Sequence, residues 1–252
     1  MTKTLHDKRE RNPYKIIVIG ASGSGKTTLA STSHGKQYWF CFEDGLTSLL
    51  GKSELYDSMK YDTYLCTSEE KSAGDSWKRA YDKLTSLSKD LECYDTIVID
   101  SISSMTEVVL QAVQKNLRNF GKAPSHGLSN PYEPWTNLCI GCTNFVRGLL
   151  SLPCNVILIA HELHEKGDDG RMYWQIQGEG TKFPNWLPKS VDELWRMEVT
   201  SLKGEDKYIL RTRGGRGFQA KSRMAPIGKY QAEEEPNIAA LVDRFNQNLH
   251  KE

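Results

Sequence analysis

Nine consecutive residues near the amino end have the composition and spacing of a phosphate-binding loop: Gly20, Ala21, Ser22, Gly23, Ser24, Gly25, Lys26, Thr27 and Thr28. They directly follow the apolar run 14–19. A strand that ends in a glycine-rich turn and then opens a helix points several backbone N–H groups into one cavity. In such a loop Lys26 reaches the β and γ phosphates of a nucleotide, and the Thr27 hydroxyl ligates Mg²⁺. The pattern predicts binding of ATP with Mg²⁺. A glycine-rich turn without a ligand is the alternative, and the preceding strand counts against it.

Two carboxylates follow apolar runs that are typical of buried strands. Asp100 directly follows the run 95–99. A carboxylate at the end of a strand beside a phosphate loop holds Mg²⁺ directly or through water. Glu43 follows the run 37–42, where it can orient a water molecule and take its proton for in-line attack on the γ phosphate. Asp44 is the alternative base. The sequence thus predicts Asp100 as a metal ligand and Glu43 as the catalytic base.

A histidine follows a third apolar run in the same way. His161 comes directly after 155–160, and it can donate a hydrogen bond to the γ phosphate and so distinguish ATP from ADP. A capping or core histidine is the alternative. Ligands of open α/β sheets bind at the carboxyl ends of the strands, where Glu43, Asp100 and His161 would meet the phosphate loop. We therefore expect all three in one site.

The apolar runs alternate with helical patterns, which predicts an α/β fold with a mainly parallel central sheet flanked by helices. We expect three parts: an amino-terminal tail, a core domain and a carboxy-terminal helix, at 1–12, 13–232 and 233–252. Predicted strands are 14–19, 37–42, 59–66, 95–101 and 155–161. Predicted helices are 26–33, 76–91, 104–119, 135–152 and 238–249. The Gly-, Pro- and Ser-rich segment 121–134 is predicted to be a loop.

The order of these parts resembles the RecA-like P-loop NTPase core, and more closely the small phage-encoded ATP-binding proteins that consist of that core alone and act in single-strand annealing and recombination. The resemblance is carried by the segments 20–28, 40–43, 95–101, 157–162 and 210–213. It implies late antiparallel strands after the parallel ones, and Glu43 as catalytic base. The family usually has glutamine where His161 stands, and that residue couples the γ phosphate to a DNA-binding loop. The resemblance also implies that Arg211 and Arg213, on a late strand, contact the nucleotide of a neighbouring subunit as arginine fingers. Plain surface or DNA-facing charges are the alternative for both arginines.

The segment 162–189 combines basic and aromatic residues, the usual pairing for binding single strands without sequence preference. Lys166, Arg171 and Lys182 offer phosphate contacts, and Lys221 and Arg223 extend the predicted groove. Flat faces for base stacking come from Tyr173, Trp174, Phe183 and Trp186. The tip 167–170 reads as a turn, and a β-hairpin whose aromatic residues pack on the core is the alternative.

Composition sets milder limits. The 252 residues carry 33 Lys and Arg against 32 Asp and Glu, so no overall field draws the protein to nucleic acid or membrane. A basic tract lies at 203–229, with eight basic and two acidic residues. The start of the chain has no signal-peptide core and no apolar stretch is long enough to span a membrane. We expect a soluble cytoplasmic protein without membrane partners, in the host cell cytoplasm if it is phage-encoded.

The six cysteines are expected to be reduced thiols. Cys139 and Cys142, with His161 and His164, have the residue types of a zinc site. The two pairs fall on different predicted elements, so buried thiols are the favoured interpretation.

These features together predict an ATP-binding and hydrolysing RecA-like protein that assembles into a ring or filament and acts on single-stranded DNA in recombination or annealing. A single-strand DNA-binding protein is a candidate further partner. A replicative-helicase-type motor or loader ATPase and an ATP-gated DNA-binding module with negligible turnover are the alternatives, and a small-molecule kinase ranks below them.

Overall fold

The computed structural model describes residues 13–65, 73–89, 94–119, 133–167, 169–202, 204–215 and 217–251. The strands are β1 (Lys15–Gly20), β2 (Gln37–Cys41), β3 (Met59–Thr63), β4 (Thr96–Asp100), β5 (Asn155–Lys166), β6 (Met172–Ile176), β7 (Glu193–Leu202), β8 (Glu205–Arg211), β9 (Lys221–Ser222) and β10 (Glu233–Glu234). The helices are α2 (Lys26–Ser31), α3 (Ala73–Lys89), α4 (Ile102–Asn119), α5 (Glu133–Ser151), α6 (Lys182–Ser190), α7 (Ala225–Gly228) and α8 (Ile238–Leu249), with 3₁₀ turns η1 (Leu46–Leu49) and η2 (Ser53–Leu55). The predicted amino-terminal tail and most of the predicted loop 121–134 lie outside the described residues.

One sheet organises the chain, in the order β10-β8-β7-β1-β5-β4-β2-β3. All neighbours from β7 to β3 in this order are parallel. The later strands are antiparallel: β8 pairs with β7, β10 with β8, and β9 with β7. Strand β6 forms an antiparallel hairpin with the outer half of β5. The predicted fold class, a mainly parallel sheet with late antiparallel strands, is confirmed.

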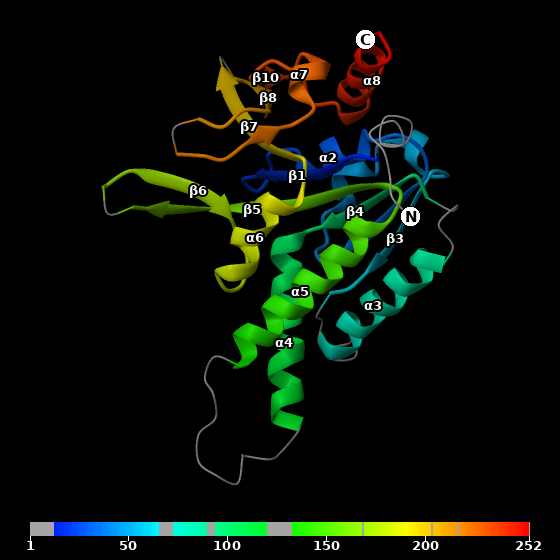
Figure 1. Cartoon of the computed structure of the whole chain (residues 1–252), viewed down its shortest axis with the longest axis vertical. Coiled ribbons are helices and arrows are strands. Elements are labelled where there is room, and N and C mark those ends of the chain that lie inside the picture. Colours follow the sequence, from blue (N-terminus) through cyan, green and yellow to red (C-terminus); the bar gives the residue numbers. More distant parts are fainter. Residues whose placement is uncertain are drawn as a thin grey trace.

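Helices cover both faces of this sheet because its central strands are apolar on both sides. In β1, Ile17 and Ile19 pack into one core, which is closed by α3, α4, α5 and α6. Ile16 and Val18 face the other core, which is closed by α2, α7, α8 and the two 3₁₀ turns. Figure 1 shows the first group of helices below the strands and α7 and α8 above them. Helix α8 thus packs on the same core as the phosphate-loop helix α2.

The region 162–189 is more regular than the predicted loop. Strand β5 continues past His161 to Lys166 and pairs with β6, which gives the hairpin that projects from the sheet in Figure 1. The rest includes α6, which contains Pro188 and was not predicted. Phe183 and Leu187 stand four residues apart, which places both on the face of α6 that packs into the core. That spacing was the available signal, but two prolines in nine residues obscured it.

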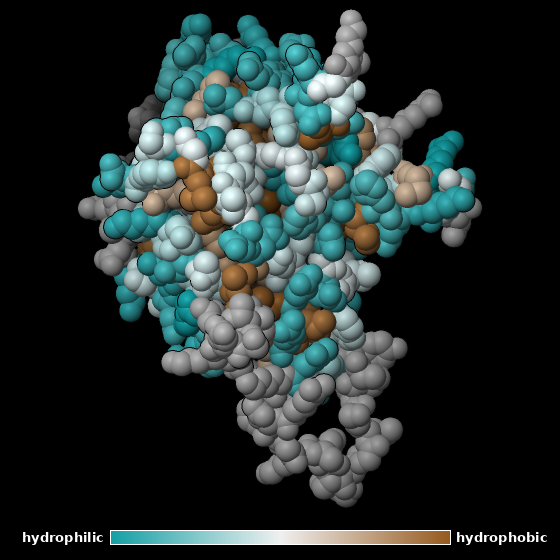
Figure 2. Space-filling view, turned by 180° about the vertical axis from the view of Figure 1, so that it is seen from behind, coloured by the Kyte–Doolittle hydropathy of each residue, from teal (hydrophilic) through white to brown (hydrophobic). Residues whose placement is uncertain are grey.

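The described surface is largely hydrophilic on the face seen in Figure 2, where apolar residues form small separate groups. Within the described ranges, none of the helices combines the length and the apolar character needed to cross a bilayer.

Candidate nucleotide-binding site

The phosphate loop starts where β1 ends, between two parallel neighbours. Gly20 lies level with His161 of β5 and with Met197 of β7. A Cβ on Gly20 would stand 2.6 Å from the Met197 carbonyl oxygen, so this position accepts only glycine. Gly25 has φ of 84°, a left-handed conformation that glycine adopts without strain, and α2 begins at the next residue. The predicted strand, loop and helix are all present.

Lys26 is buried inside the loop. Its Nζ donates hydrogen bonds to the carbonyl oxygens of Gly20 (3.0 Å) and Ala21 (2.7 Å). Burial lowers the pKa of Lys26, and the nearby carboxylates of Glu43 and Asp100 oppose that change. The ammonium is therefore held at the loop by weak neutral acceptors, and a phosphate oxygen would be a stronger partner.

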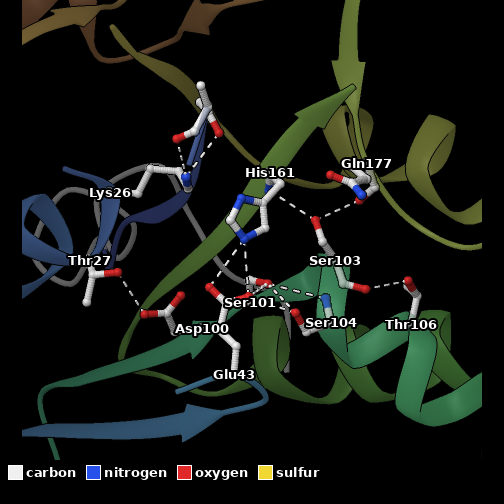
Figure 3. A network of polar contacts seen from close by, with 12 residues as sticks. Lys26, Thr27, Glu43, Asp100, Ser101, Ser103, Ser104, Thr106, His161 and Gln177 are labelled. Carbon is white, nitrogen blue, oxygen red and sulfur yellow. Dashed lines mark hydrogen bonds and ion pairs between the residues drawn. The ribbon is translucent and has the colours of Figure 1, made fainter. Parts of the chain in front are cut away.

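Thr27 and Asp100 meet as the sequence predicts for two metal ligands. The Thr27 hydroxyl donates to Oδ2 of Asp100 at 2.9 Å (Figure 3). The other oxygen, Oδ1, is buried and has no hydrogen-bond partner among the described residues. Burial, with the charge of Glu43 next, raises the pKa of Asp100 to about 6. A hydroxyl beside a carboxylate oxygen without a partner is a donor set that suits Mg²⁺.

Glu43 follows β2 and is held by three side chains that point toward its carboxylate (Figure 3). It accepts hydrogen bonds from Ser101 (2.8 Å), Ser104 (2.7 Å) and Nε2 of His161 (3.1 Å). Burial raises the pKa of Glu43, but the bonds from His161, Ser104 and Ser101 outweigh it and lower the pKa to about 2. Held in this way the carboxylate is a weak base, and release of the donors would make it a stronger one.

The backbone of His161 belongs to a second polar link. The Ser103 hydroxyl accepts from the His161 backbone N–H (3.0 Å) and donates to the Gln177 carbonyl (2.8 Å). The Gln177 N–H donates in turn to the His161 carbonyl (2.9 Å). These bonds join the end of the parallel part of β5, the start of α4 and the segment between β6 and α6.

The serines of this site were missing from the sequence-based prediction. Ser101, Ser103 and Ser104 follow Asp100 within four positions, and this cluster of hydroxyls at a strand end was the available signal. Gly45 was also missed: a Cβ there would lie 3.6 Å from Oδ2 of Asp100 and 3.9 Å from Oγ1 of Thr27. The chain after Glu43 therefore passes close to the predicted metal ligands.

Tyr208 is a further residue that the prediction missed. It lies on β8, its side chain is 45% exposed, and its ring would be 3.1 Å from a Cβ built on Gly25. The aromatic ring thus rests against the phosphate loop from a strand that comes 183 positions later in the sequence. Only the register of β8 against β7 brings the two together, and the sequence carries no signal for that register.

The two predicted arginine fingers differ in their surroundings. Arg211 ends β8 and forms ion pairs with Glu198 (2.5 Å) and Glu233 (2.6 Å) of its own chain. Arg213 follows the strand, is exposed, and makes a long bond of 3.5 Å to the Tyr230 carbonyl. Arg213 is the freer of the two guanidinium groups.

Arg211 also belongs to a row of alternating charges that crosses the late strands. Glu162, directly after His161, holds Arg196 of β7 with two bonds of 2.8 and 3.1 Å. Arg196 pairs with Glu198, which pairs with Arg211. The Arg196 guanidinium also stacks on Trp174, 5.3 Å from the ring centre, so one face of this predicted DNA-binding tryptophan is covered by a side chain of β7.

The other predicted DNA-binding residues are not gathered in one groove. Lys166 and Arg171 are exposed at the end of the β5–β6 hairpin, and Lys182 is exposed at the start of α6. Lys221, by contrast, pairs with Leu194 near the beginning of β7, and its Nζ donates to the Val191 carbonyl. By the strand register this point lies about eight residues, or roughly 26 Å, from Lys166. Arg223, in the same region, pairs with Asp192 at 2.7 Å.

The aromatic residues proposed for base stacking also differ. Tyr173 is exposed on the hairpin and donates to Asp169 at 2.7 Å. Phe183 is only 1% exposed, and Trp186 is partly buried beneath the Arg147 guanidinium. Buried Phe183 therefore cannot stack on a base at the surface.

The cysteine and histidine pairs considered for zinc lie on different elements. Cys139 and Cys142 are on α5, while His161 and His164 are on β5. The His161 imidazole is also hydrogen-bonded to Glu43. Within the described part of the chain no group of three or more His, Cys, Asp or Glu side chains is arranged to hold a metal ion.

Comparison with known proteins assigns the chain to a family. The family model AAA_24, described as an AAA domain, matches residues 12–224. No curated protein matches the chain. Among solved structures it is similar to the flagellar accessory protein FlaH from Methanocaldococcus jannaschii, with 15% identity, a TM-score of 0.43, and coverage of 92% of this chain and 90% of that chain. Because the family match spans most of the sequence and includes the phosphate loop, Glu43, Asp100 and His161, the protein belongs to this AAA domain family and has an AAA-type P-loop ATPase domain.

Proposed function

We propose that the protein binds ATP with Mg²⁺, hydrolyses it slowly, and uses the cycle to act on single-stranded DNA in recombination or annealing. The observation that carries this proposal is the polar chain from Glu43 through His161 and Ser103 to Gln177. It joins the predicted catalytic base to the segment between the β5–β6 hairpin and α6, which is flanked by exposed basic residues: Lys166 and Arg171 on the hairpin and Lys182 at the start of α6.

Each residue of the site has a part in hydrolysis. The backbone N–H groups of the loop and the Lys26 ammonium bind the β and γ phosphates and stabilise the charge that develops there. Mg²⁺ bound by Thr27 and Asp100 would neutralise phosphate charge. Glu43 orients the attacking water and accepts its proton.

The three hydrogen bonds to Glu43 offer a way for ATP to control the basicity of this carboxylate. In the structure the carboxylate is held by three donors, which keep its pKa low. A γ phosphate within reach of His161 would compete with Glu43 for the imidazole N–H. The freed carboxylate would become more basic, and the movement of His161 would pass through Ser103 to Gln177. The effect of ATP binding would in this way be transmitted to the side of the protein that is proposed to face DNA.

We further propose a homo-oligomer, a ring or a filament, in which an arginine of one subunit contacts the nucleotide of the next. Arg213 is the better candidate because Arg211 would have to break two ion pairs first. The cytoplasm of the cell, or of the host if the gene belongs to a phage, is the proposed location.

The test is ATP turnover with and without single-stranded DNA for the wild type, Lys26→Ala and Lys36→Ala. Lys36 is exposed and its side chain lies outside the site, so that variant is the matched control. We expect stimulation by DNA in the wild type and in the control, and no turnover in Lys26→Ala. Turnover that ignores DNA would remove the DNA part of the proposal. Absence of magnesium-dependent ATP binding by folded wild type would remove all of it.

A second candidate function, an ATP-gated DNA-binding module with negligible turnover, is favoured by the engagement of Glu43 with three donors. It predicts that Glu43→Gln anneals DNA as well as the wild type does. The hydrolytic proposal predicts a defect in repeated cycles of annealing.

A further inference from the structure

A cavity of about 320 Å³ lies outside the nucleotide site, between the first turn of α5 and the turn that leads into α6. These two helices lie side by side (Figure 1). Leu138 and Phe183 are the buried parts of its lining. Trp135 forms an open wall: it is 43% exposed, and its ring would lie 3.5 Å from a Cβ built on Gly180. The cavity has the size of a small ligand site rather than of a groove for a helix.

Two charged side chains stand at this cavity, and neither is paired within the described ranges. Glu179 and Lys182 line it, and no ion pair or side-chain hydrogen bond holds either group there. An apolar, aromatic wall with one free carboxylate and one free ammonium fits a flat ring that carries N–H groups on its edge and a phosphate nearby. A nucleobase in a single strand has that combination. An aliphatic or phenyl side chain of a protein would leave both charges without a matching group.

We propose that this cavity receives one base of a bound single strand. The base stacks on Trp135, Glu179 accepts hydrogen bonds from N–H groups on the base edge, and Lys182 contacts the adjoining phosphate. The inference rests on the proposed function, because it names a subsite for the DNA that the ATPase is proposed to act on.

The cavity is connected to the nucleotide site by hydrogen bonds. The backbone N–H of Glu179 donates to the Thr106 hydroxyl (2.9 Å), which donates to the Ser103 carbonyl (2.7 Å). The Ser103 hydroxyl in turn bonds Gln177 and the backbone of His161. A base that fixes the position of Glu179 therefore acts on the segment that holds His161 against Glu43, which offers a route for stimulation of hydrolysis by DNA.

The test compares two single strands of equal length, one of oligo(dC) and one of abasic sites, by fluorescence anisotropy. Loss of one stacked base costs about 1–3 kcal/mol, so Trp135→Ala should weaken binding of oligo(dC) about 5- to 150-fold. Binding of the abasic strand should not change, and Trp135→Phe should retain most of the affinity. Ile140→Ala is the matched control, because Ile140 is 53% exposed on the same helix and does not line the cavity.

Cys139 provides a second measurement that needs no substitution. It lines the cavity and is partly exposed, so alkylation of its thiol can be followed by peptide mass spectrometry. We expect oligo(dC) to protect Cys139 and the abasic strand to leave it reactive.

The outcomes separate the inference from the function beneath it. If the wild type binds both strands equally, or if Trp135→Ala binds oligo(dC) like the wild type and Cys139 stays reactive, the base subsite is wrong while DNA binding stands. Protection of Cys139 by a tryptophan-rich peptide but not by DNA would also overturn it. If the folded wild type binds no single-stranded DNA, the proposed function fails, and the subsite with it.

Discussion

The nucleotide site and the predicted DNA-binding residues differ in what fixes them in space. Glu43, Asp100 and His161 come from sequence positions up to 118 apart, yet hydrogen bonds of about 3 Å connect Glu43 to His161 and Asp100 to the loop. The carboxyl ends of parallel strands meet at one edge of the sheet, so the topology gathers them. Lys166 and Lys221 are both predicted DNA contacts, but the structure places them toward opposite ends of the strands. A residue at the end of a parallel strand has its position fixed by the sheet, whereas a basic residue on the surface can lie anywhere along the strands.

The two regions also differ in electrostatics. In the nucleotide site, burial and hydrogen bonding move two carboxylates in opposite directions, with the pKa of Asp100 raised and that of Glu43 lowered. Perturbed pairs of this kind mark functional sites. At the hairpin, Arg171 is 81% exposed and its contact with Asp169 spans 3.6 Å, so solvent screens it. We therefore expect changes in the first region to have large effects and changes in the second to have small ones.

The largest effect is expected from Glu43→Gln. The amide keeps the shape of the side chain but cannot accept a proton from water, so turnover should fall about 100- to 1,000-fold. ATP binding, measured by calorimetry, should remain because the loop and the predicted metal ligands are untouched. Exposed Glu235→Gln is the matched control. Full turnover in Glu43→Gln would show that Glu43 is not the catalytic base, although it lies with the other site residues at the strand ends.

Asp100→Asn should weaken magnesium-dependent ATP binding about 10- to 100-fold, since a neutral amide is a poor ligand for Mg²⁺. It should also stabilise the protein without nucleotide. The ordinary Asp pKa of 3.8 is raised to about 6 on folding, so the folded state binds the proton more tightly. That contribution is present below pH 3.8 and is lost as pH rises through 6. The difference corresponds to roughly 3 kcal/mol at pH 7 and above.

The pH dependence of unfolding separates this carboxylate from Glu43. The pKa of Glu43 is about 2, below its ordinary value of 4.5, so its stabilising contribution is present above pH 4.5 and is lost as pH falls toward 2. The difference in stability between the wild type and Asp100→Asn, measured by urea titration between pH 5 and 8, therefore reports on Asp100 rather than on Glu43. Wild-type stability should fall across that range relative to Asp100→Asn, and a constant difference would contradict the raised pKa.

These contrasts explain what the sequence could predict. The phosphate loop, the apolar runs and the polar residue after each run are local patterns. They were sufficient to predict the fold class and which residues lie around the loop. The register of late antiparallel strands depends on pairings between distant residues. For this reason Tyr208 against Gly25 and the charge row through Arg196 could not be read from local patterns. Helix α6 was missed because two prolines in nine residues obscured the helical spacing of Phe183 and Leu187.

Tyr208→Ala tests whether a residue from the late strands supports the loop. An aromatic contact of this kind contributes about 0.5–1.5 kcal/mol, so the KM for ATP should rise about 2- to 12-fold with a smaller change in kcat. Tyr208→Phe keeps the ring and should behave like the wild type. An unchanged KM in Tyr208→Ala would mean that the loop is held by the central strands alone.

The smallest effects are expected for surface charges. Variants at the two ends of the strands test which of the predicted DNA-binding residues contact DNA. The double variant Lys166→Gln, Arg171→Gln removes exposed charges at the hairpin, and Lys221→Gln, Arg223→Gln removes charges at the other end of the strands. We expect the first to weaken binding of single-stranded DNA about 2- to 5-fold and to lower the dependence of log affinity on log salt by about 0.7 for each lost phosphate contact. The second should change neither, because Lys221 and Arg223 are bonded to Val191 and Asp192 of their own chain. Equal effects of both variants would mean that the DNA path runs along the strands and joins the two ends that the fold separates.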